Sequence, residues 1–258
     1  EIRLSLVGSE MCIRDRIKFI DARQALSIQI HPDDEYALEV ENEFGKNEMW
    51  YVVDCEPGAY LYCGLSKDTS KEEIEQRIKN NTITDILNKI EVKPGDCVFV
   101  KAGTIHAIGA GILICEIQQN SNCTYRMYDY DRKDKFGNKR ELHIKKALDV
   151  VNVKKYIPFR KKESEQDIDD INKVKSYTLV SCKYFECFKY NVFGECNIKG
   201  DSASFISIII ISGSGEIKVD SLKNSEAEMF KAGDLSLIHI SEPTRVRRIS
   251  YAVFCLKK

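Results

Sequence analysis

Short runs of alternating apolar and polar residues, separated by turns rich in proline, glycine and aspartate, fill positions 17 to 132. Alternation with a period of two is typical of half-buried strands, and frequent turns indicate an antiparallel barrel or sandwich. We predict strands at 27–30, 49–54, 59–63, 96–100, 107–108, 113–119 and 124–128. Residues 70–80 and 84–88 carry isoleucine and leucine at helical spacing, which predicts a short helical insertion, and 144–151 predicts another helix.

The second half of the chain repeats the pattern of the first. Residues 154–175 are highly charged with few large apolar side chains, which is typical of a linker. Strand-like runs resume over 177–240, where 230–235 (FKAGDL) resembles 92–97 (VKPGDC). The sequence therefore predicts an all-β, mainly antiparallel protein with a first β-domain at 17–153, a linker at 154–175 and a related β-domain at 176–258.

Two segments look foreign to this pattern. Residues 4–16 (LSLVGSEMCIRDR) and 235–245 (LSLIHISEPTR) resemble translated sequencing-adaptor sequence. We therefore predict that 1–16 and about 235–245 are not native, and we assign no function to Cys12 or His239. The alternative is an ordinary amphipathic start and an ordinary strand.

Composition excludes several classes of partner. The 39 basic and 40 acidic residues give a net charge of -1, which does not favour nucleic acid. The longest apolar run, 205–211, is far shorter than the roughly 20 residues that span a bilayer, and no secretory signal pattern is present. Ten cysteines occur without C-x-x-C spacing, which indicates reduced thiols in the cytoplasm. We expect a small-molecule partner.

Four residues form a candidate metal site. Gln29 and His31 lie two apart on a predicted strand and so share a face, Glu48 begins the next apolar run, and His106 follows the turn at Ala102 and Gly103. A lone histidine in a β-protein is usually a hydrogen-bonded structural residue. Together, however, two imidazoles, a carboxylate and an amide oxygen suit zinc with a position open to substrate, and no cysteine is needed.

These residues stand in motifs that resemble a known family. Residues 94–107 resemble the second cupin motif, with Lys101 in place of the usual proline, a departure that affects turn rigidity. The runs 26–37 (LSIQIHPDDEYA), 45–52 (GKNEMWYV), 102–111 (AGTIHAIGAG) and 116–129 (EIQQNSNCTYRMYD) resemble type I mannose-6-phosphate isomerase in its short bacterial form. The likeness covers about 17–152 and continues weakly beyond.

The resemblance implies a fold and a site. We expect a cupin β-jelly roll, with a second, degenerate cupin-like domain that lacks metal ligands. The chain would bind one zinc ion through Gln29, His31, Glu48 and His106, with Arg126 as the active-site arginine and Lys46 in the substrate pocket. The expected partner is a sugar phosphate, with no nucleic acid or membrane partner and a monomeric state favoured.

The implied reaction interconverts mannose 6-phosphate and fructose 6-phosphate through an enediol. Arg126 stays protonated, so it would stabilise an oxyanion or bind the phosphate. Lys46 would bind phosphate or take part in proton transfer, unless it is a solvated turn lysine. Glu116 is a candidate general base, or alternatively an ion-pair partner of Arg126. His143, before the helix at 144–151, is predicted to be structural.

Two other function classes stay open. The alternatives are another metal-dependent cupin enzyme, such as an oxygenase or epimerase, and a non-catalytic sugar-binding cupin. Lys46 and Arg126 beside four ligand-type residues favour an enzyme, because binding alone does not require that set. Family members begin several dozen residues upstream of the match, so we expect the intact gene product to be an isomerase and this chain to fold and turn over less well.

Overall fold

A computed structural model of the chain describes residues 15–161, 167–169, 174–198, 206–219, 228–238, 244–247 and 251–257. Contacts divide the chain into two units, Glu1–Arg160 and Lys161–Lys258. The division lies inside the predicted linker at 154–175, whose role as a linker stays a prediction. No helix among the described residues has the length and apolar character needed to cross a bilayer.

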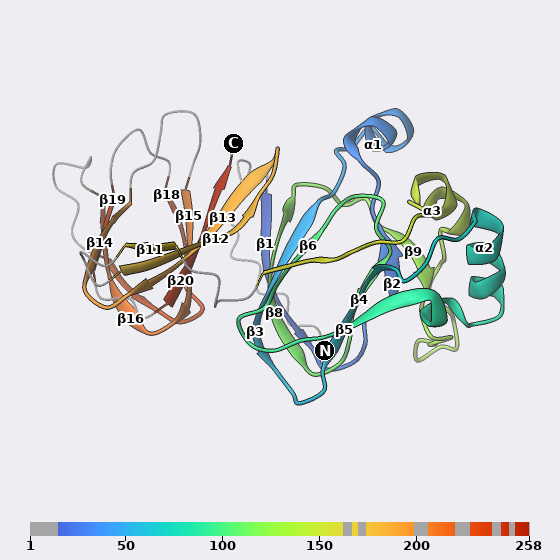
Figure 1. Cartoon of the computed structure of the whole chain (residues 1–258), viewed down its shortest axis with the longest axis horizontal. Coiled ribbons are helices and arrows are strands. Elements are labelled where there is room, and N and C mark those ends of the chain that lie inside the picture. The colour runs from blue at the N-terminus through green and yellow to red at the C-terminus, as the bar shows by residue number, and fades with distance from the viewer. Residues whose placement is uncertain are drawn as a thin grey trace. The chain divides into compact units, whose positions relative to one another are not determined.

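Unit 1 contains ten strands and three α-helices among its described residues (Figure 1). In chain order they are β1 (Asp15–Ala22), β2 (Ile28–Ile30), α1 (Asp34–Glu41), β3 (Glu48–Cys55), β4 (Tyr60–Leu65), α2 (Lys71–Lys79), the 3-10 helix η1 (Ile83–Ile86), β5 (Leu87–Glu91), β6 (Cys97–Val100), β7 (His106–Ile108), β8 (Ile112–Gln119), β9 (Tyr125–Tyr128), α3 (Ile144–Val150) and β10 (Phe159–Lys161).

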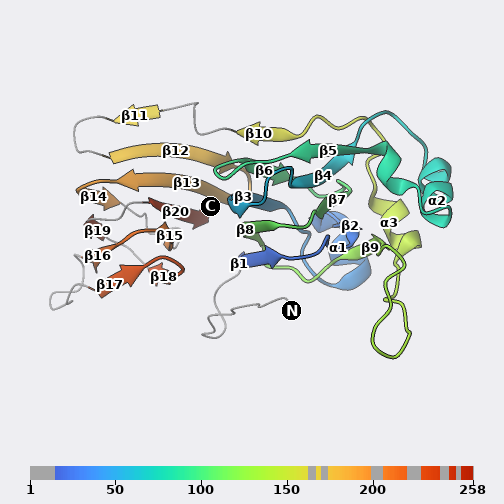
Figure 2. The same cartoon turned by 90° about the horizontal axis from the view of Figure 1, so that it is seen from below.

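The strands of unit 1 form two five-stranded sheets. Their orders are β1-β8-β3-β6-β10 and β5-β4-β7-β2-β9. The pairings of β3 with β6 and β8, and of β7 with β2 and β4, are antiparallel, and Figure 2 shows β1, β8 and β3 as neighbours. The predicted, mainly antiparallel β-architecture is therefore confirmed.

Apolar residues fill the space between the two sheets. Trp50, Val52 and Ile114 from the first sheet meet Leu61 and Ile108 from the second in one buried cluster. The polar side chains described below occupy the same interlayer space, so the two sheets can place them opposite one another.

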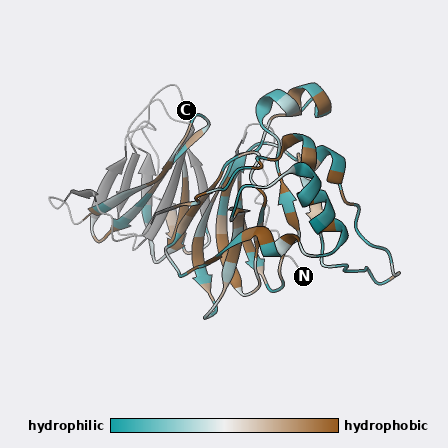
Figure 3. Ribbon diagram, turned by 45° about the vertical axis from the view of Figure 1, so that its right-hand side comes forward, coloured by the Kyte–Doolittle hydropathy of each residue, from teal (hydrophilic) through white to brown (hydrophobic). Residues whose placement is uncertain are grey.

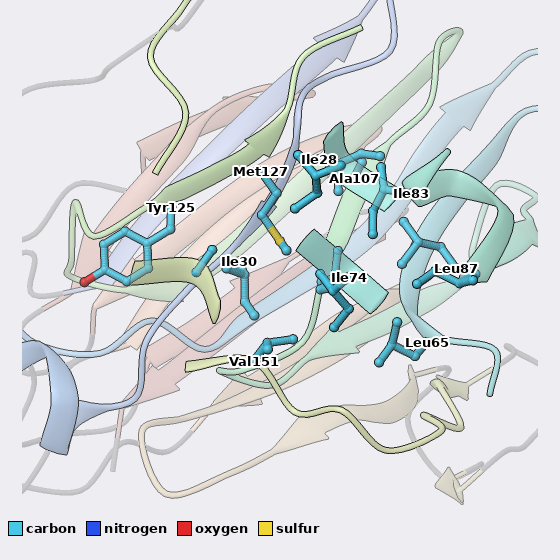
Figure 4. Packing of buried hydrophobic residues seen from close by; sticks show 14 residues of the cluster. Ile28, Ile30, Leu65, Ile74, Ile83, Leu87, Ala107, Tyr125, Met127 and Val151 are labelled. Carbon is cyan, nitrogen blue, oxygen red and sulfur yellow. The ribbon is translucent and has the colours of Figure 1, made fainter. Parts of the chain in front are cut away.

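A second core lies on the outer face of the β5-β4-β7-β2-β9 sheet. Ile28 and Ile30 of β2 and Met127 of β9 pack there against Ile74 of α2 and Val151 beyond α3 (Figure 4). Successive strand residues point to opposite faces. Because Ile28 and Ile30 point outward to the helices, Gln29 points inward between the sheets.

The predicted helical insertion is confirmed at α2, and at 84–88 it holds only for 84–86, which lie in the 3-10 helix η1. Ser70 caps α2 by accepting the Glu73 backbone N–H at 3.1 Å, and hydrophobic and hydrophilic residues alternate along the helices in Figure 3. Residues 87 and 88 instead begin strand β5, which pairs with β4. Sheet pairing here overrides the helical spacing of apolar residues.

Strand β1 and helix α1 are among the elements that were not predicted. Strand β1 pairs along its length with β8. Helix α1 begins after Asp33, whose carboxylate accepts the Tyr36 backbone N–H at 3.0 Å, and ends at Asn42, which adopts a left-handed conformation with φ 53°. Both ends of α1 therefore carry local capping signals that the sequence contains.

Unit 2 is also built of strands. They are β11 (Asp167–Asp169), β12 (Val174–Ser181), β13 (Phe185–Val192), β14 (Glu195–Ile198), β15 (Ile206–Ser212), β16 (Ser214–Val219), β17 (Glu228–Lys231), β18 (Leu235–Ile238), β19 (Thr244–Arg247) and β20 (Tyr251–Lys257). The sheet orders are β11-β12-β13-β20-β15-β18 and β14-β19-β16-β17.

Residues 1–14 and 239–243, with Cys12 and His239, lie outside the described part of the chain. The prediction that 1–16 and about 235–245 are not native therefore stays a prediction.

One turn occurs in both units with the same hydrogen bonds. In unit 1 the Lys93 N–H donates to the Asp96 carboxylate at 2.9 Å, and in unit 2 the Lys231 N–H donates to the Asp234 carboxylate at 2.9 Å. Each turn also contacts the neighbouring strand: Gly95 N to Val52 O at 2.8 Å, and Gly233 N to Ile210 O at 2.8 Å. The repeat predicted from VKPGDC and FKAGDL is thus visible as a shared turn.

Candidate metal centre

Strands β2, β7 and β9 place three of the predicted site residues side by side. Gln29 pairs in register with His106 on one side and with Arg126 on the other. The strand residues next to these three, such as Ile28, belong to the outer core. The side chains of Gln29, His106 and Arg126 therefore share the inner face of this sheet.

His31 and Glu48 are brought together by a close approach of two loop segments. A Cβ on Gly45 would lie 2.3 Å from the Asp33 carbonyl carbon, so glycine allows the segment before β3 to lie against the segment after β2. The Lys46 N–H donates to the Pro32 carbonyl at 3.0 Å. Glu48 on β3 consequently faces His31 from the opposite sheet.

The metal-ligand candidates His31, Glu48 and His106 form one buried cluster. One ligand atom from each lies within 4.8 Å of the others. His31 Nε2 lies 3.1 Å from Glu48 Oε1, and His106 Nε2 lies 3.6 Å from Glu48 Oε2. All three side chains are at most 1% exposed. Gln29 Nε2 lies 3.4 Å from His106 Nε2, so the fourth predicted ligand borders the cluster.

Both imidazoles are oriented by backbone carbonyl groups. His31 Nδ1 lies 2.7 Å from the Cys123 carbonyl oxygen, and His106 Nδ1 lies 2.9 Å from that of Thr104. Each Nδ1 then carries the hydrogen and donates it, which leaves the Nε2 lone pair directed toward Glu48. Orientation of this kind is common for metal-binding histidines.

Burial and charge keep the cluster in the protonation state that a metal requires. Burial, with repulsion from Lys46, lowers the pKa of His31 to about 4, and burial lowers the pKa of His106. Burial opposes ionisation of Glu48, but Lys46 and His31 outweigh it and hold its pKa well below the usual range. Neutral imidazoles and an ionised carboxylate are the forms that bind divalent cations.

The Glu48 carboxylate supports the fit of a cation. Both of its oxygens are buried and neither accepts a hydrogen bond, although the Lys46 ammonium approaches Oε1 at 2.6 Å. Lys46 supplies a positive charge to Oε1, whereas Oε2 faces only the neutral His106 Nε2 at 3.6 Å, so a cation at Oε2 would compensate a buried carboxylate oxygen. The donor set of two imidazole nitrogens and a carboxylate oxygen suits zinc, and a half-turn of the Gln29 amide would add an oxygen ligand.

Lys46 is part of this cluster and not a solvated turn residue. Its side chain is only 6% exposed, and Nζ lies 3.3 Å from His31 Nε2 as well as 2.6 Å from Glu48. The interpretation as an exposed lysine is therefore wrong, because the close approach at Gly45 draws the residue inward. Its predicted role in substrate binding or proton transfer stays a prediction.

Arg126 lines a cavity of about 420 Å³ next to the cluster. The lining comprises Leu26, Ser27, Gln29, Arg126, Asp129, Arg132, Lys133, Asp134 and Arg140. Arg126 Nη1 donates to the Glu141 carbonyl at 2.9 Å, whereas its buried Nε has no hydrogen-bond partner. Burial, with repulsion from Arg140, lowers the pKa of Arg126, but a guanidinium stays protonated. Four basic and two acidic side chains give the lining a net positive charge, although Arg132 and Arg140 both pair with Asp129, and Gln29 is part of the lining.

Glu116 lies between the sheets but contacts neither Arg126 nor the three clustered ligands. Within residues 15–161, Glu116 Oε1 pairs with Lys18 Nζ at 2.6 Å, and Oε2 accepts the Trp50 indole N–H at 3.2 Å. The alternative of an ion pair with Arg126 is therefore wrong, since Lys18 occupies that role. The general-base role of Glu116 stays a prediction.

Sequence reasoning missed Lys18 and gave Trp50 no role. Lys18 pairs in register with Glu116, and Trp50 pairs with Glu116 from the other side. Lys18 lies two residues before the buried Ile20, so strand alternation was the signal that could have placed it on the inner face. His143 Nδ1 accepts the Arg126 backbone N–H at 3.2 Å, and its structural role stays a prediction.

No protein-family model matches the chain. The curated relatives, however, are all named for one kind of enzyme. Mannose-6-phosphate isomerase ManA of Bacillus subtilis (strain 168) is 42% identical over 222 residues, which is 86% of this chain and 67% of the relative. Mannose-6-phosphate isomerase of Streptococcus mutans is 40% identical over 202 residues, which is 78% of this chain and 62% of the relative.

Solved structures show the same fold. The mannose 6-phosphate isomerase from Bacillus subtilis aligns with a TM-score of 0.81 and 32% identity, over 93% of this chain and 74% of that one. The apo form of the Salmonella typhimurium enzyme aligns at 0.67 with 14% identity, a likeness of fold alone. The predicted cupin fold is thereby confirmed. The identity, coverage and buried cluster together place the chain in the mannose-6-phosphate isomerase family.

Proposed function

We propose that this chain carries the catalytic domain of a zinc-dependent aldose-ketose isomerase that interconverts mannose 6-phosphate and fructose 6-phosphate. The observation that carries the proposal is the buried cluster of His31, Glu48 and His106, whose candidate ligand atoms all lie within 4.8 Å of one another. Curated relatives named for this reaction support it. Gln29 completes the proposed ligand set.

The reaction moves a proton between C1 and C2 through an enediol. The protein must therefore stabilise negative charge on a substrate oxygen while a base carries the proton. When bound, zinc supplies Lewis-acid stabilisation of that charge. The Lys46 ammonium, held in the cluster, donates a hydrogen bond to the reacting oxygens. Arg126 contributes a second fixed positive charge from the neighbouring cavity.

The positively charged cavity is suited to bind the phosphate group of the proposed substrate. Arginine binds phosphate well because its planar group offers several donors, and Arg126, Arg132 and Arg140 all line this cavity. Gln29 lines the cavity and also borders the metal cluster. A sugar phosphate bound there would present its other end to the cluster.

Two alternative functions can be distinguished from the proposed one by their metal or by the absence of turnover. Another metal-dependent cupin enzyme would use the same ligand set with a different metal, commonly iron, and a non-catalytic sugar-binding cupin would bind without turnover. The buried Lys46 beside the ligands favours catalysis, because a binding module has no need of an ammonium against a metal carboxylate. We also propose a cytoplasmic location and a monomeric state. The described cysteines form no disulfide.

The deciding experiment is a coupled assay of mannose 6-phosphate conversion before chelation, after chelation and after zinc is restored. Loss and recovery of activity would support both reaction and cofactor. Glu48→Gln is the matched variant, because it keeps the shape of the side chain and removes the charged ligand. Restored activity with iron and not zinc, or turnover that is unaffected by chelation, would contradict the proposal.

A further inference from the structure

Glu116 is the one predicted catalytic residue whose contacts in unit 1 do not lead directly to the cluster or the cavity. Its side chain is 5% exposed, and each carboxylate oxygen has a partner, Lys18 on one side and Trp50 on the other. A general base needs an oxygen available to the substrate proton. Both Glu116 oxygens are instead directed at neighbouring strands of their own sheet.

Trp50 connects Glu116 to the metal cluster. The Trp50 ring meets the His106 imidazole edge-on, with centroids 5.3 Å apart and an interplanar angle of 71°. Trp50 is 1% exposed and lies two residues beyond Glu48 on β3, so both side chains point between the sheets. The indole is fixed in turn by its hydrogen bond to Glu116.

His106 is thereby held from three directions. Its Nδ1 is bonded to the Thr104 carbonyl, its ring lies 4.7 Å from that of His31, and the indole of Trp50 closes another side. A single hydrogen bond would leave the imidazole free to tilt about its Nδ1 contact. The Trp50 edge limits that tilt and keeps Nε2 directed at Glu48.

We propose that Glu116 is a positioning residue that, paired with Lys18, holds the Trp50 indole against His106 and so fixes this imidazole for metal binding. The inference rests on the proposed metal at His31, Glu48 and His106. Groups behind metal ligands typically change metal affinity by about 10 to 100-fold when removed, and Glu116 acts at the lower end because it works through Trp50.

The test compares two variants by zinc affinity, measured by competition with a chromophoric chelator. Glu116→Gln retains an oxygen that accepts the indole N–H, so zinc affinity is expected within about 3-fold of the wild type. Lys18→Met with Glu116→Leu removes the acceptor without leaving a buried ammonium unpaired, and should weaken zinc binding about 10-fold. Urea unfolding of the metal-free proteins checks that each variant is folded.

A double-mutant cycle tests whether the effect passes through the indole. In a Trp50→Phe background, where no N–H remains, the Lys18→Met and Glu116→Leu changes should alter zinc affinity by less than about 2-fold. An effect as large as in the wild-type background would overturn the proposal, because Glu116 would then act on the cluster by another route.

Turnover separates positioning from proton transfer. With saturating zinc, Glu116→Gln is expected to keep kcat within several-fold of the wild type, whereas loss of a general base lowers kcat by about 100 to 10,000-fold. A collapse of kcat with unchanged zinc affinity would overturn the inference and leave the proposed function intact. Failure of the wild-type chain to bind zinc would overturn both.

Discussion

The indole N–H of Trp50 donates to the Glu116 carboxylate at 3.2 Å, and the two residues pair directly across strands β3 and β8. This contact places the single tryptophan of the chain with its ring centroid 5.3 Å from that of His106. The protein therefore carries an intrinsic fluorophore against a candidate metal ligand, and its emission can be read without any label.

Zinc binding is expected to change Trp50 fluorescence. Metal coordination at His106 alters the charge and position of a ring in contact with the indole, so titration of the metal-free chain should give a saturable change in emission. The matched control is Glu48→Gln, which leaves Trp50 in place and removes the charged ligand. An identical titration curve for this variant would place the zinc elsewhere.

Removal of the Glu48 carboxylate should destabilise the metal-free chain. Glu48→Leu leaves the buried Lys46 ammonium without its partner at 2.6 Å, which costs about 3 to 5 kcal/mol of unfolding free energy. Adding Lys46→Met should restore most of the loss, because no buried charge then remains. Urea denaturation measures both. Equal stability of the single and double variants would show that the pair is not desolvated.

The stability contributed by Asp129 should be lost in acid. Burial opposes its ionisation, but hydrogen bonds from Arg140 and Arg132 outweigh burial and lower its pKa. A carboxyl with a lowered pKa stabilises the fold above its unfolded pKa of 3.8 and loses that contribution as pH falls through the folded value.

Asp129→Asn is accordingly expected to cost about 1 to 3 kcal/mol at pH 7. The difference from the wild type should shrink as pH falls below about 4. Denaturant midpoints across that range measure it. A difference that stays constant with pH would mean that the two arginines do not favour the ionised form.

Gly45→Ala should damage both the fold and the metal cluster. The new Cβ would meet the Asp33 backbone at 2.3 Å, so the two segments that carry Lys46 and His31 must separate. We expect weaker zinc binding and a lower denaturation midpoint. Gly137→Ala is the control: its φ is +87° with open space around it, so it should cost about 1 to 2 kcal/mol and leave zinc affinity unchanged.

Much of unit 1 could be predicted because its signals are local. Gln29 and His31 share a face through strand periodicity, and the turn before His106 is signalled by Ala102 and Gly103. The pairing of Lys46 with Glu48 depends on how closely two loops approach at Gly45, which no periodicity encodes. The sequence therefore indicated the candidate ligands that the structure brings together, but not the burial of the lysine.

Long-range pairing explains the remaining misses. Residues 84–88 look helical by spacing, yet Leu87 pairs with Leu65 on β4 and begins a strand. Glu116 looked like a base or a partner of Arg126, whereas its partners come from β1 and β3. Several polar residues point to the inner face, and the order of strands in the sheet decides which of them come into contact. A local sequence pattern does not contain that order.

The turn shared by the two units also aligns their strands. With Asp96 matched to Asp234 and Val52 to Ile210, the register partner of Val100 is Glu48 in unit 1, and the partner of Ile238 is Ile206 in unit 2. Ile206 is 1% exposed. A carboxylate and a hydrocarbon thus occupy equivalent places in two copies of one scaffold. The chain thus contains its own comparison: unit 2 keeps the shared turn and strand register with an apolar residue at this position, so neither feature requires the candidate metal-binding carboxylate of unit 1.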